Sequence, residues 1–403
     1  RALARDGGAA LGAARNALAG LLPPLISRGL PLRKLLRRWV HLVLAAPQHE
    51  RPALLAAVLA DDSAAETYLH TLVAMLLRLH VCRRVTAEQQ AAADTSKGEL
   101  PLPRSDELVR LAHTACAGAQ PHVQLLTISL VVAATPILLP EGATAASAPA
   151  PDSSSLVARR LSIASLSYAA EHLQRSLKSG REAWSDETHG SPLLSAARQL
   201  FAALVAAYEE AGKRASDAET SDVESWGEVR GAARAAMEAL NQLMPPAFLQ
   251  PVTMLLARAD GATQSLAVEL LSSRLRGGAR GAVPKEELAH MLEVTTSLLV
   301  PSSAAHTQRA ALLSLDLLAR ESVGALPELL EGALPTVVSL ASCPLPATGG
   351  DSASTLGAAL LAASALISSL GVRLVPHLPA MMPPLLRSLE ALLMPAVPTP
   401  DQL

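Results

Sequence analysis

Four cations lie close together near the start of the chain, at positions 33, 34, 37 and 38. Arg33 and Arg37 are spaced four residues apart, and so are Lys34 and Arg38. Residues at this spacing are neighbours on a helix surface, so the four side chains would form one basic strip. About one and a half helical turns of positive charge would suit two or three RNA phosphates, or an acidic protein. The alternative is the solvated face of an amphipathic helix.

One aromatic residue, Trp39, adjoins this strip. Recognition by base stacking needs several aromatic side chains among the cations, so phosphate or carboxylate contacts are favoured. We expect Trp39 to lie in the core. The surrounding segment, residues 1–40, has eight basic residues and one acid, whereas the whole chain carries a net charge of −2. One end of the molecule is therefore basic, and the rest is mildly acidic.

No other pattern in the sequence assembles a reaction site. The glycine-rich run at 277–281 has no following Lys-Ser or Lys-Thr, and it follows an expected helix where a phosphate loop needs a strand. The eleven histidines show no His-x-x-x-His spacing, and the three cysteines are too scattered for a zinc site or a disulfide framework. We expect no catalytic residue, cofactor or metal, and hence a protein that is not an enzyme.

The composition predicts which elements position these residues. Half of the 403 residues are hydrophobic, but only 2% are aromatic. Most of the apolar mass is Ala and Leu, which are strong helix formers, whereas the residues typical of strands are scarce. The prediction is an all-α protein.

Pairs of helices recur in the C-terminal half. Apolar helices are expected after Pro245, after Asp260-Gly261 and after Pro284, and first helices return about every 40 residues. Each pair leaves an apolar face that only a neighbouring pair can cover. This period predicts a HEAT/armadillo-like α-solenoid of stacked antiparallel helix pairs.

The domain organisation follows from helix patterns and polar stretches. We predict helical repeats with a basic end at 1–84, a loop at 85–104, irregular HEAT-like helices at 105–244 and regular HEAT-like repeats at 245–403. Disordered insertions are expected at 141–153, 180–191 and 215–225; the first is almost pure Ala, Ser, Pro and Thr. The apolar stretch 123–139 contains polar residues and a proline, so a buried helix is favoured over a membrane span.

Three stretches resemble one known family. The first ends a helix at Pro47-Gln48-His49-Glu50-Arg51; the second runs from Leu-Asn-Gln-Leu-Met-Pro at 240–245 to Ala-Val-Glu-Leu-Leu at 267–271; the third has spaced prolines at 370–383. In this order they resemble the HEAT-repeat proteins of the small-subunit processome, the family of U3 small nucleolar RNA-associated protein 10 and HEAT repeat-containing protein 1. Before the second run this chain has Thr263-Gln264-Ser265, where the family tends to have basic residues.

The resemblance implies a non-catalytic scaffold in the U3-containing particle, supporting pre-18S rRNA processing and rDNA transcription. Its implied partners are other processome proteins, together with pre-rRNA or U3 RNA contacted through phosphates, and its implied location is the nucleolus. Few cysteines and no visible export signal agree with the nucleus or cytosol, and the first residue, Arg1, suggests a fragment of a longer protein. Two alternatives stay open: a HEAT-repeat adaptor of nuclear transport or vesicle coats, and a direct RNA-binding module using the basic strip.

Overall fold

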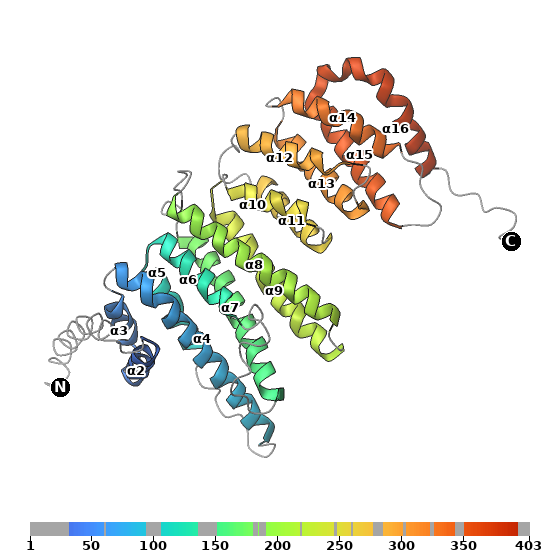
Figure 1. Ribbon diagram of the computed structural model, residues 1–403. Helices are drawn as coiled ribbons and strands as arrows, with labels where there is room; N and C mark the ends of the chain where they lie inside the picture. The colour runs from blue at the N-terminus through green and yellow to red at the C-terminus, as the bar shows by residue number, and fades with distance from the viewer. Residues whose placement is uncertain are drawn as a thin grey trace. The chain divides into compact units, whose positions relative to one another are not determined.

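The computed structural model describes residues 32–59, 62–93, 106–135, 151–179, 184, 191–217, 220–245, 248–258, 261–276, 285–300, 304–322, 326–342 and 350–393. Within these ranges every regular element is a helix, and none is a strand (Figure 1). The all-α prediction is therefore confirmed for this part of the chain. The helices form two compact units, Arg1–Met244 and Pro245–Leu403, here called unit 1 and unit 2. The expected helix at 9–27 and the glycine-rich run at 277–281 lie outside the described residues.

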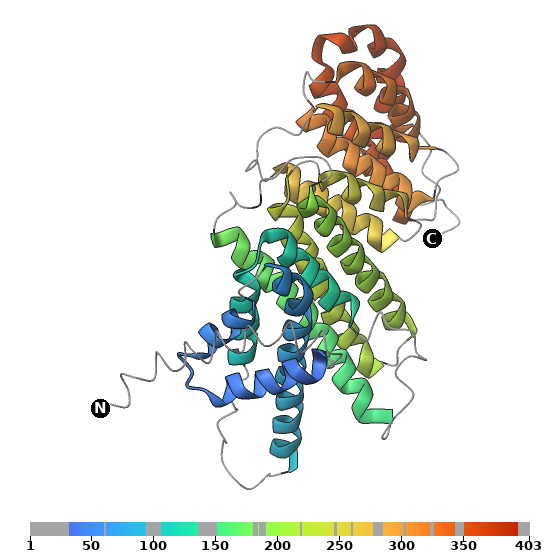
Figure 2. The same ribbon diagram turned by 60° about the vertical axis from the view of Figure 1, so that its left-hand side comes forward.

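Unit 1 consists of consecutive helices arranged in two layers (Figures 1 and 2). Its helices are α2 (Leu32–Ala45), α3 (Arg51–Val58), α4 (Asp62–Ala93), α5 (Asp106–Ala117), α6 (Pro121–Ala133), α7 (Pro151–Ser179), α8 (Pro192–Asp217) and α9 (Thr220–Leu243). In one layer α2 contacts α4, α4 contacts α6, and α6 contacts α8; in the other, α3, α5, α7 and α9 follow one another in the same way. Each even-numbered helix also packs against the next helix along the chain.

Unit 2 repeats this contact pattern. Its elements are α10 (Leu249–Met254), η5 (Leu255–Ala257), α11 (Gly261–Arg276), α12 (Lys285–Ser297), α13 (Ala305–Glu321), α14 (Pro327–Ala341), α15 (Gly350–Leu370), η6 (Gly371–His377) and α16 (Leu378–Leu393). One layer runs through α10, α12, α14 and α16, and the other runs through α11, α13 and α15. The unit begins where the regular repeats were predicted to start.

Small side chains dominate the most extensive helix contact of unit 2, between α13 and α15. Helix α13 buries Ala311 and Leu315, and α15 buries Ala359, Ala362 and Leu366. Because alanine adds little bulk, two helices rich in it can approach closely while the leucines fill the remaining space. The low aromatic content of the sequence thus becomes a core built on Ala and Leu.

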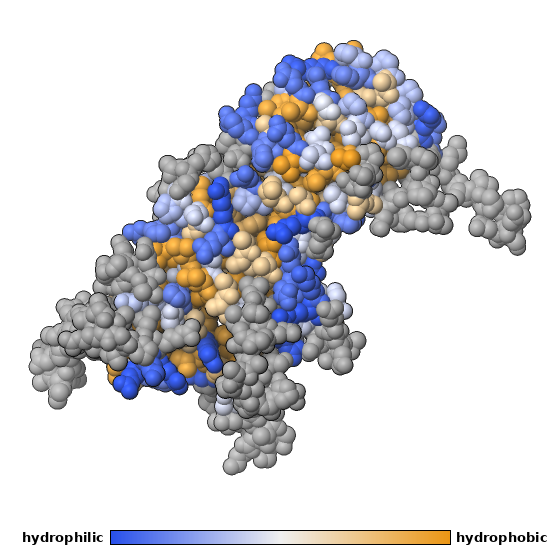
Figure 3. Space-filling model, viewed as in Figure 1, coloured by the Kyte–Doolittle hydropathy of each residue, from blue (hydrophilic) through white to orange (hydrophobic). Residues whose placement is uncertain are grey.

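Helix α15 ends at a glycine. Gly371 has φ of +53°, the left-handed conformation that glycine adopts without strain and that commonly follows the last helical residue. The chain then continues through the 3-10 helix η6 into α16. Hydrophobic side chains reach the surface here, Val372 and Leu386 among them, and Figure 3 shows hydrophobic and hydrophilic residues interleaved on the surface of both units. Isolated surface hydrophobics are normal in folded proteins.

Three predicted loops proved partly helical. Helix α4 continues to Ala93, inside the loop expected at 85–104, because residues 87–93 are almost all good helix formers. Helix α7 starts at Pro151, inside the insertion expected at 141–153, since proline suits the first helical turn. Helices α8 and α9 occupy most of 215–225, leaving only 218 and 219 outside the description.

The insertion expected at 180–191 contains a core residue. Trp184 lies within it and is only 4% exposed. A large apolar ring gains more from burial than the surrounding polar residues lose, so this position is held against the helices. By contrast, the stretch expected as a buried helix, 123–139, is confirmed over Pro121–Ala133, where Leu125 and Ile128 are fully buried in α6.

Candidate functional site: a charged cleft between four helices

The predicted basic strip lies on α2. Lys34, Arg37 and Arg38 are exposed, and Trp39 is 5% exposed, as predicted for a core residue. Arg33 belongs to the same helix, but its side chain lies outside the described residues. Among the residues with described side chains, none forms an ion pair with Lys34, Arg37 or Arg38. This arrangement agrees with a solvated helix face and with a contact surface alike.

The turn at 47–51, part of the family resemblance, holds three helices together through Arg51. Its guanidinium donates hydrogen bonds to the carbonyl oxygens of Ala46 and Leu44 at the end of α2, both at 2.9 Å. It also pairs with Glu107 of α5, with Nη1 2.6 Å from Oε1. Helix ends leave carbonyl groups without partners, and here one arginine satisfies two of them. The role of this arginine is structural.

A chain of buried polar groups joins α5, α6 and α7. The side-chain amide of Gln124 donates to the carbonyl oxygen of Ala119 at 2.7 Å, which turns its Oε1 toward His172. His172 donates from Nε2 to that oxygen at 2.9 Å, so its Nδ1 is left as an acceptor for Nδ1 of His113 at 3.2 Å. The order of donors thus assigns the tautomers of both histidines.

The same order leaves Nε2 of His113 without a proton. This nitrogen is buried and has no hydrogen-bond partner among the described residues, and it lies 3.4 Å from Oε2 of Glu171. Its ring stacks on Tyr168 with the centroids 4.5 Å apart. Burial, reinforced by the positive charge of Arg175, lowers the pKa of His113 to about 3 and that of His172 to about 4. Both histidines are therefore neutral at physiological pH.

Cys116 lies beside this network, under the Tyr168 hydroxyl. Burial raises the pKa of its thiol to about 12. A thiol rather than a thiolate is present at neutral pH, so Cys116 is not an activated nucleophile. No group of three or more metal-ligating side chains occurs among the residues with described side chains.

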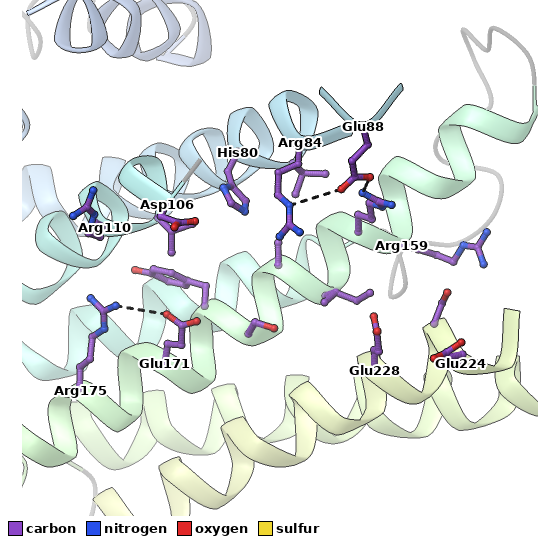
Figure 4. Close-up of a pocket in the computed structure, with 18 residues that line it drawn as sticks. His80, Arg84, Glu88, Asp106, Arg110, Arg159, Glu171, Arg175, Glu224 and Glu228 are labelled. Atoms are coloured by element: carbon purple, nitrogen blue, oxygen red, sulfur yellow. Dashed lines mark hydrogen bonds and ion pairs between the residues drawn. The ribbon is translucent and has the colours of Figure 1, made fainter. Parts of the chain in front are cut away.

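A cleft of about 950 Å³ opens in unit 1 beside the network (Figure 4). Side chains from α4, α5, α7 and α9 line it, and five of them are arginines and five are acids. Val81 and Ile163 add apolar surface, and Tyr168 presents its ring. This mixture of charge and apolar surface is the most distinctive concavity in the described part of unit 1.

Some of the charges in the cleft pair with each other. Glu88 of α4 forms ion pairs with Arg84 and with Arg160. Glu171 and Arg175 pair along α7, with Oε2 and Nη2 3.6 Å apart. These pairs neutralise part of the cleft wall.

Other charges have no such partner. Arg110 of α5 and the two acids Glu224 and Glu228 of α9 form no side-chain pair among the described residues. Figure 4 places Arg110 and Arg175 toward one end of the cleft and the two acids toward the other. The cleft is therefore positive at one end and negative at the opposite end.

One helical stretch, Ser354–Arg387, is long and apolar enough to cross a membrane. It is interrupted at Gly371, and its first helix, α15, packs against α13 and α14. Helices packed in a protein core meet the same test of length and composition. No protein-family model matches the chain, and no curated protein matches its sequence.

Proposed function

We propose that this chain is a HEAT-like α-solenoid that acts as a non-catalytic scaffold for other macromolecules. The observation that carries the proposal is the contact pattern of the helices. In both units a helix contacts its neighbour along the chain and the helix two positions further on, in its own layer. Stacked helix pairs in solenoids have this nearest-neighbour pattern, which leaves long ridges of helices available for partners.

The surface features support binding rather than catalysis. Unit 1 presents an exposed basic helix and a cleft of mixed charge, both suited to non-covalent contacts. The buried histidines and Cys116 belong to the packing between helices, and their proton affinities are held far from those of an acid–base pair working near neutral pH. Hydrolysis of nucleotide or RNA by the purified chain, abolished by one substitution, would overturn this part of the proposal.

We further propose that the scaffold serves ribosome biogenesis, in the small-subunit processome of the nucleolus. What supports this is the resemblance of three stretches, in order, across most of the chain. The role of Arg51 adds a physical reason for one of them, since its turn holds consecutive repeats together. The implied partners are processome proteins and pre-rRNA or U3 RNA.

The test is the set of molecules that co-purify with the tagged parent protein, together with its location. We expect U3 RNA, processome proteins and nucleolar staining. Recovery of nuclear transport factors or coat subunits, with staining at the nuclear envelope or Golgi, would overturn the processome proposal in favour of an adaptor. A second candidate, direct RNA binding, is favoured by the exposure of Lys34, Arg37 and Arg38.

A further inference from the structure

We propose that the cleft between α4, α5, α7 and α9 binds an extended segment of a partner protein that is acidic at one end and basic at the other. The inference deepens the proposed scaffold function, on which it rests, by assigning a site and a class of partner. It stands on three observations: the charge at each end of the cleft, the nature of its middle, and its length.

The two ends of the cleft carry opposite charges that the rest of the described chain does not neutralise. At one end Arg110 of α5 is exposed, and Arg175 of α7 lies nearby with its weak 3.6 Å pair to Glu171 (Figure 4). At the other end Glu224 and Glu228 are exposed one turn apart on α9. Arg110 and the two α9 acids are therefore free to pair with charges of a ligand.

The middle of the cleft suits uncharged residues. Glu88 is shared there between Arg84 and Arg160, so these charges satisfy each other. Val81, Ile163 and the ring of Tyr168 line the same space. A segment with small or apolar residues between two charged ends would bury them here without leaving a charge unpaired.

The length of the cleft fits a short peptide. Its residues on α7 run from Arg159 to Arg175, which spans about 24 Å at the helical rise of about 1.5 Å per residue. An extended chain advances about 3.3 Å per residue, so about seven residues would cover that distance.

The charge composition favours protein over nucleic acid. A strand of RNA carries a negative charge at every nucleotide, and five acids line this cleft. Glu224 and Glu228 would face those phosphates without a cation between them, and like charges in close contact weaken binding. A peptide can instead match positive to negative at each end.

The test uses the whole 403-residue chain and labelled synthetic peptides of about nine residues, followed by fluorescence anisotropy at low salt. The bipolar peptide has two glutamates at one end, small and apolar residues in the middle, and two lysines at the other end. Uniformly acidic and uniformly basic peptides of equal length are the comparisons. We expect the bipolar peptide to bind at least about tenfold more tightly than either.

Substitutions at the two ends then localise the site. Arg110→Glu and the pair Glu224→Lys with Glu228→Lys should each weaken binding of the bipolar peptide by about fivefold or more. Arg83→Glu makes the same charge change on an exposed α4 residue outside the cleft, and it should leave binding unchanged. The double lysine variant should also bind the acidic peptide more tightly than the original chain does. Circular dichroism checks that every variant is folded.

Equal binding of all three peptides, or equal effects of Arg83→Glu and Arg110→Glu, would overturn the proposal. Displacement of the bipolar peptide by single-stranded RNA would overturn it in favour of an anion site. Failure of this site is distinguishable from failure of the scaffold function. If Arg110→Glu changes no peptide affinity while partners still co-purify, the cleft proposal alone falls; if no partner co-purifies with the original chain while the peptide binds as expected, the scaffold proposal falls.

Discussion

The two units bury different kinds of side chain between their helices. In unit 1 the interface of α5, α6 and α7 contains His113, His172 and Gln124, and α2 is tied to α5 through Arg51 and Glu107. In unit 2 the interface of α13 and α15 consists mainly of alanine and leucine. The same layered arrangement is thus held together partly by ionisable partners in one unit and by packing alone at the main interface of the other.

Unit 2 also buries polar groups, but its best-defined ones are neutral and bind the backbone. Gln264 of α11 donates to the carbonyl oxygens of Leu256 and Arg258, and to the hydroxyl of Thr307 on α13. Ser369 of α15 donates to the carbonyl oxygen of Ala319 at 2.6 Å. Groups of this kind do not titrate, so acid should weaken unit 1 before unit 2.

The largest expected effect is that of pH on unit 1. The pKa values of His113 and His172 are lowered in the folded state, so the unfolded chain takes up protons first as the pH falls below about 6.5. Stability is fully present above that pH and is lost on the way down to about pH 4. Between pH 7.5 and pH 5, each histidine should lower the free energy of unfolding by about 2 kcal/mol. Urea unfolding followed by tryptophan fluorescence measures it.

Tryptophan reports unit 1 alone, because the three tryptophans of the chain are Trp39, Trp184 and Trp226. The control replaces His113 and His172 with glutamine, which should remove most of the pH dependence between pH 7.5 and 5. An unchanged slope in this variant would mean that other groups cause the loss of stability.

Packing at the α13–α15 interface gives the next largest effect. Leu366 is fully buried on α15, so Leu366→Ala should cost unit 2 about 3 kcal/mol through lost burial and the cavity that remains. Leu361 lies on the same helix but is 50% exposed, and Leu361→Ala should cost less than about 1 kcal/mol. The helical signal of circular dichroism measures both. Equal losses from the two substitutions would contradict the assigned interface.

The Arg51 clamp predicts a smaller loss in unit 1. Arg51→Ala removes hydrogen bonds to two carbonyl groups and leaves Glu107 without its cation, so the free energy of unfolding should fall by about 2 kcal/mol. A double-mutant cycle with Glu107→Gln measures the ion pair itself by tryptophan fluorescence. Strictly additive effects would show that the two side chains do not interact.

The smallest effect on stability is expected at the basic strip. Replacing Arg33, Lys34, Arg37 and Arg38 together with glutamine should change the free energy of unfolding by less than about 1 kcal/mol, because the described side chains of the strip are exposed. We also expect unchanged affinity for single-stranded RNA. A loss of RNA affinity that shrinks between 50 and 200 mM salt would instead favour the RNA-binding alternative.

The sequence by itself determined the helical class of the described chain, the burial of Trp39, the buried helix α6 and the start of the regular helix pairs near Pro245. These features depend on propensity and periodicity over a few turns, which neighbouring residues decide. Helix ends were less predictable: residues 87–93 and 220–225 are polar enough to suggest loops, yet they extend α4 and α9. Trp184 escaped prediction because a single apolar residue in a polar stretch has no period.

The tertiary structure decided which residues meet. Arg51 and Glu107 are 56 residues apart, and His113 and His172 are 59 apart. The cleft draws its side chains from four helices between His80 and Glu228, and no local pattern marks them as a set. Which faces of two helices touch depends on the packing of both against their other neighbours. The basic strip is visible in the sequence because it lies on one helix, whereas the charged cleft exists only once four helices are stacked.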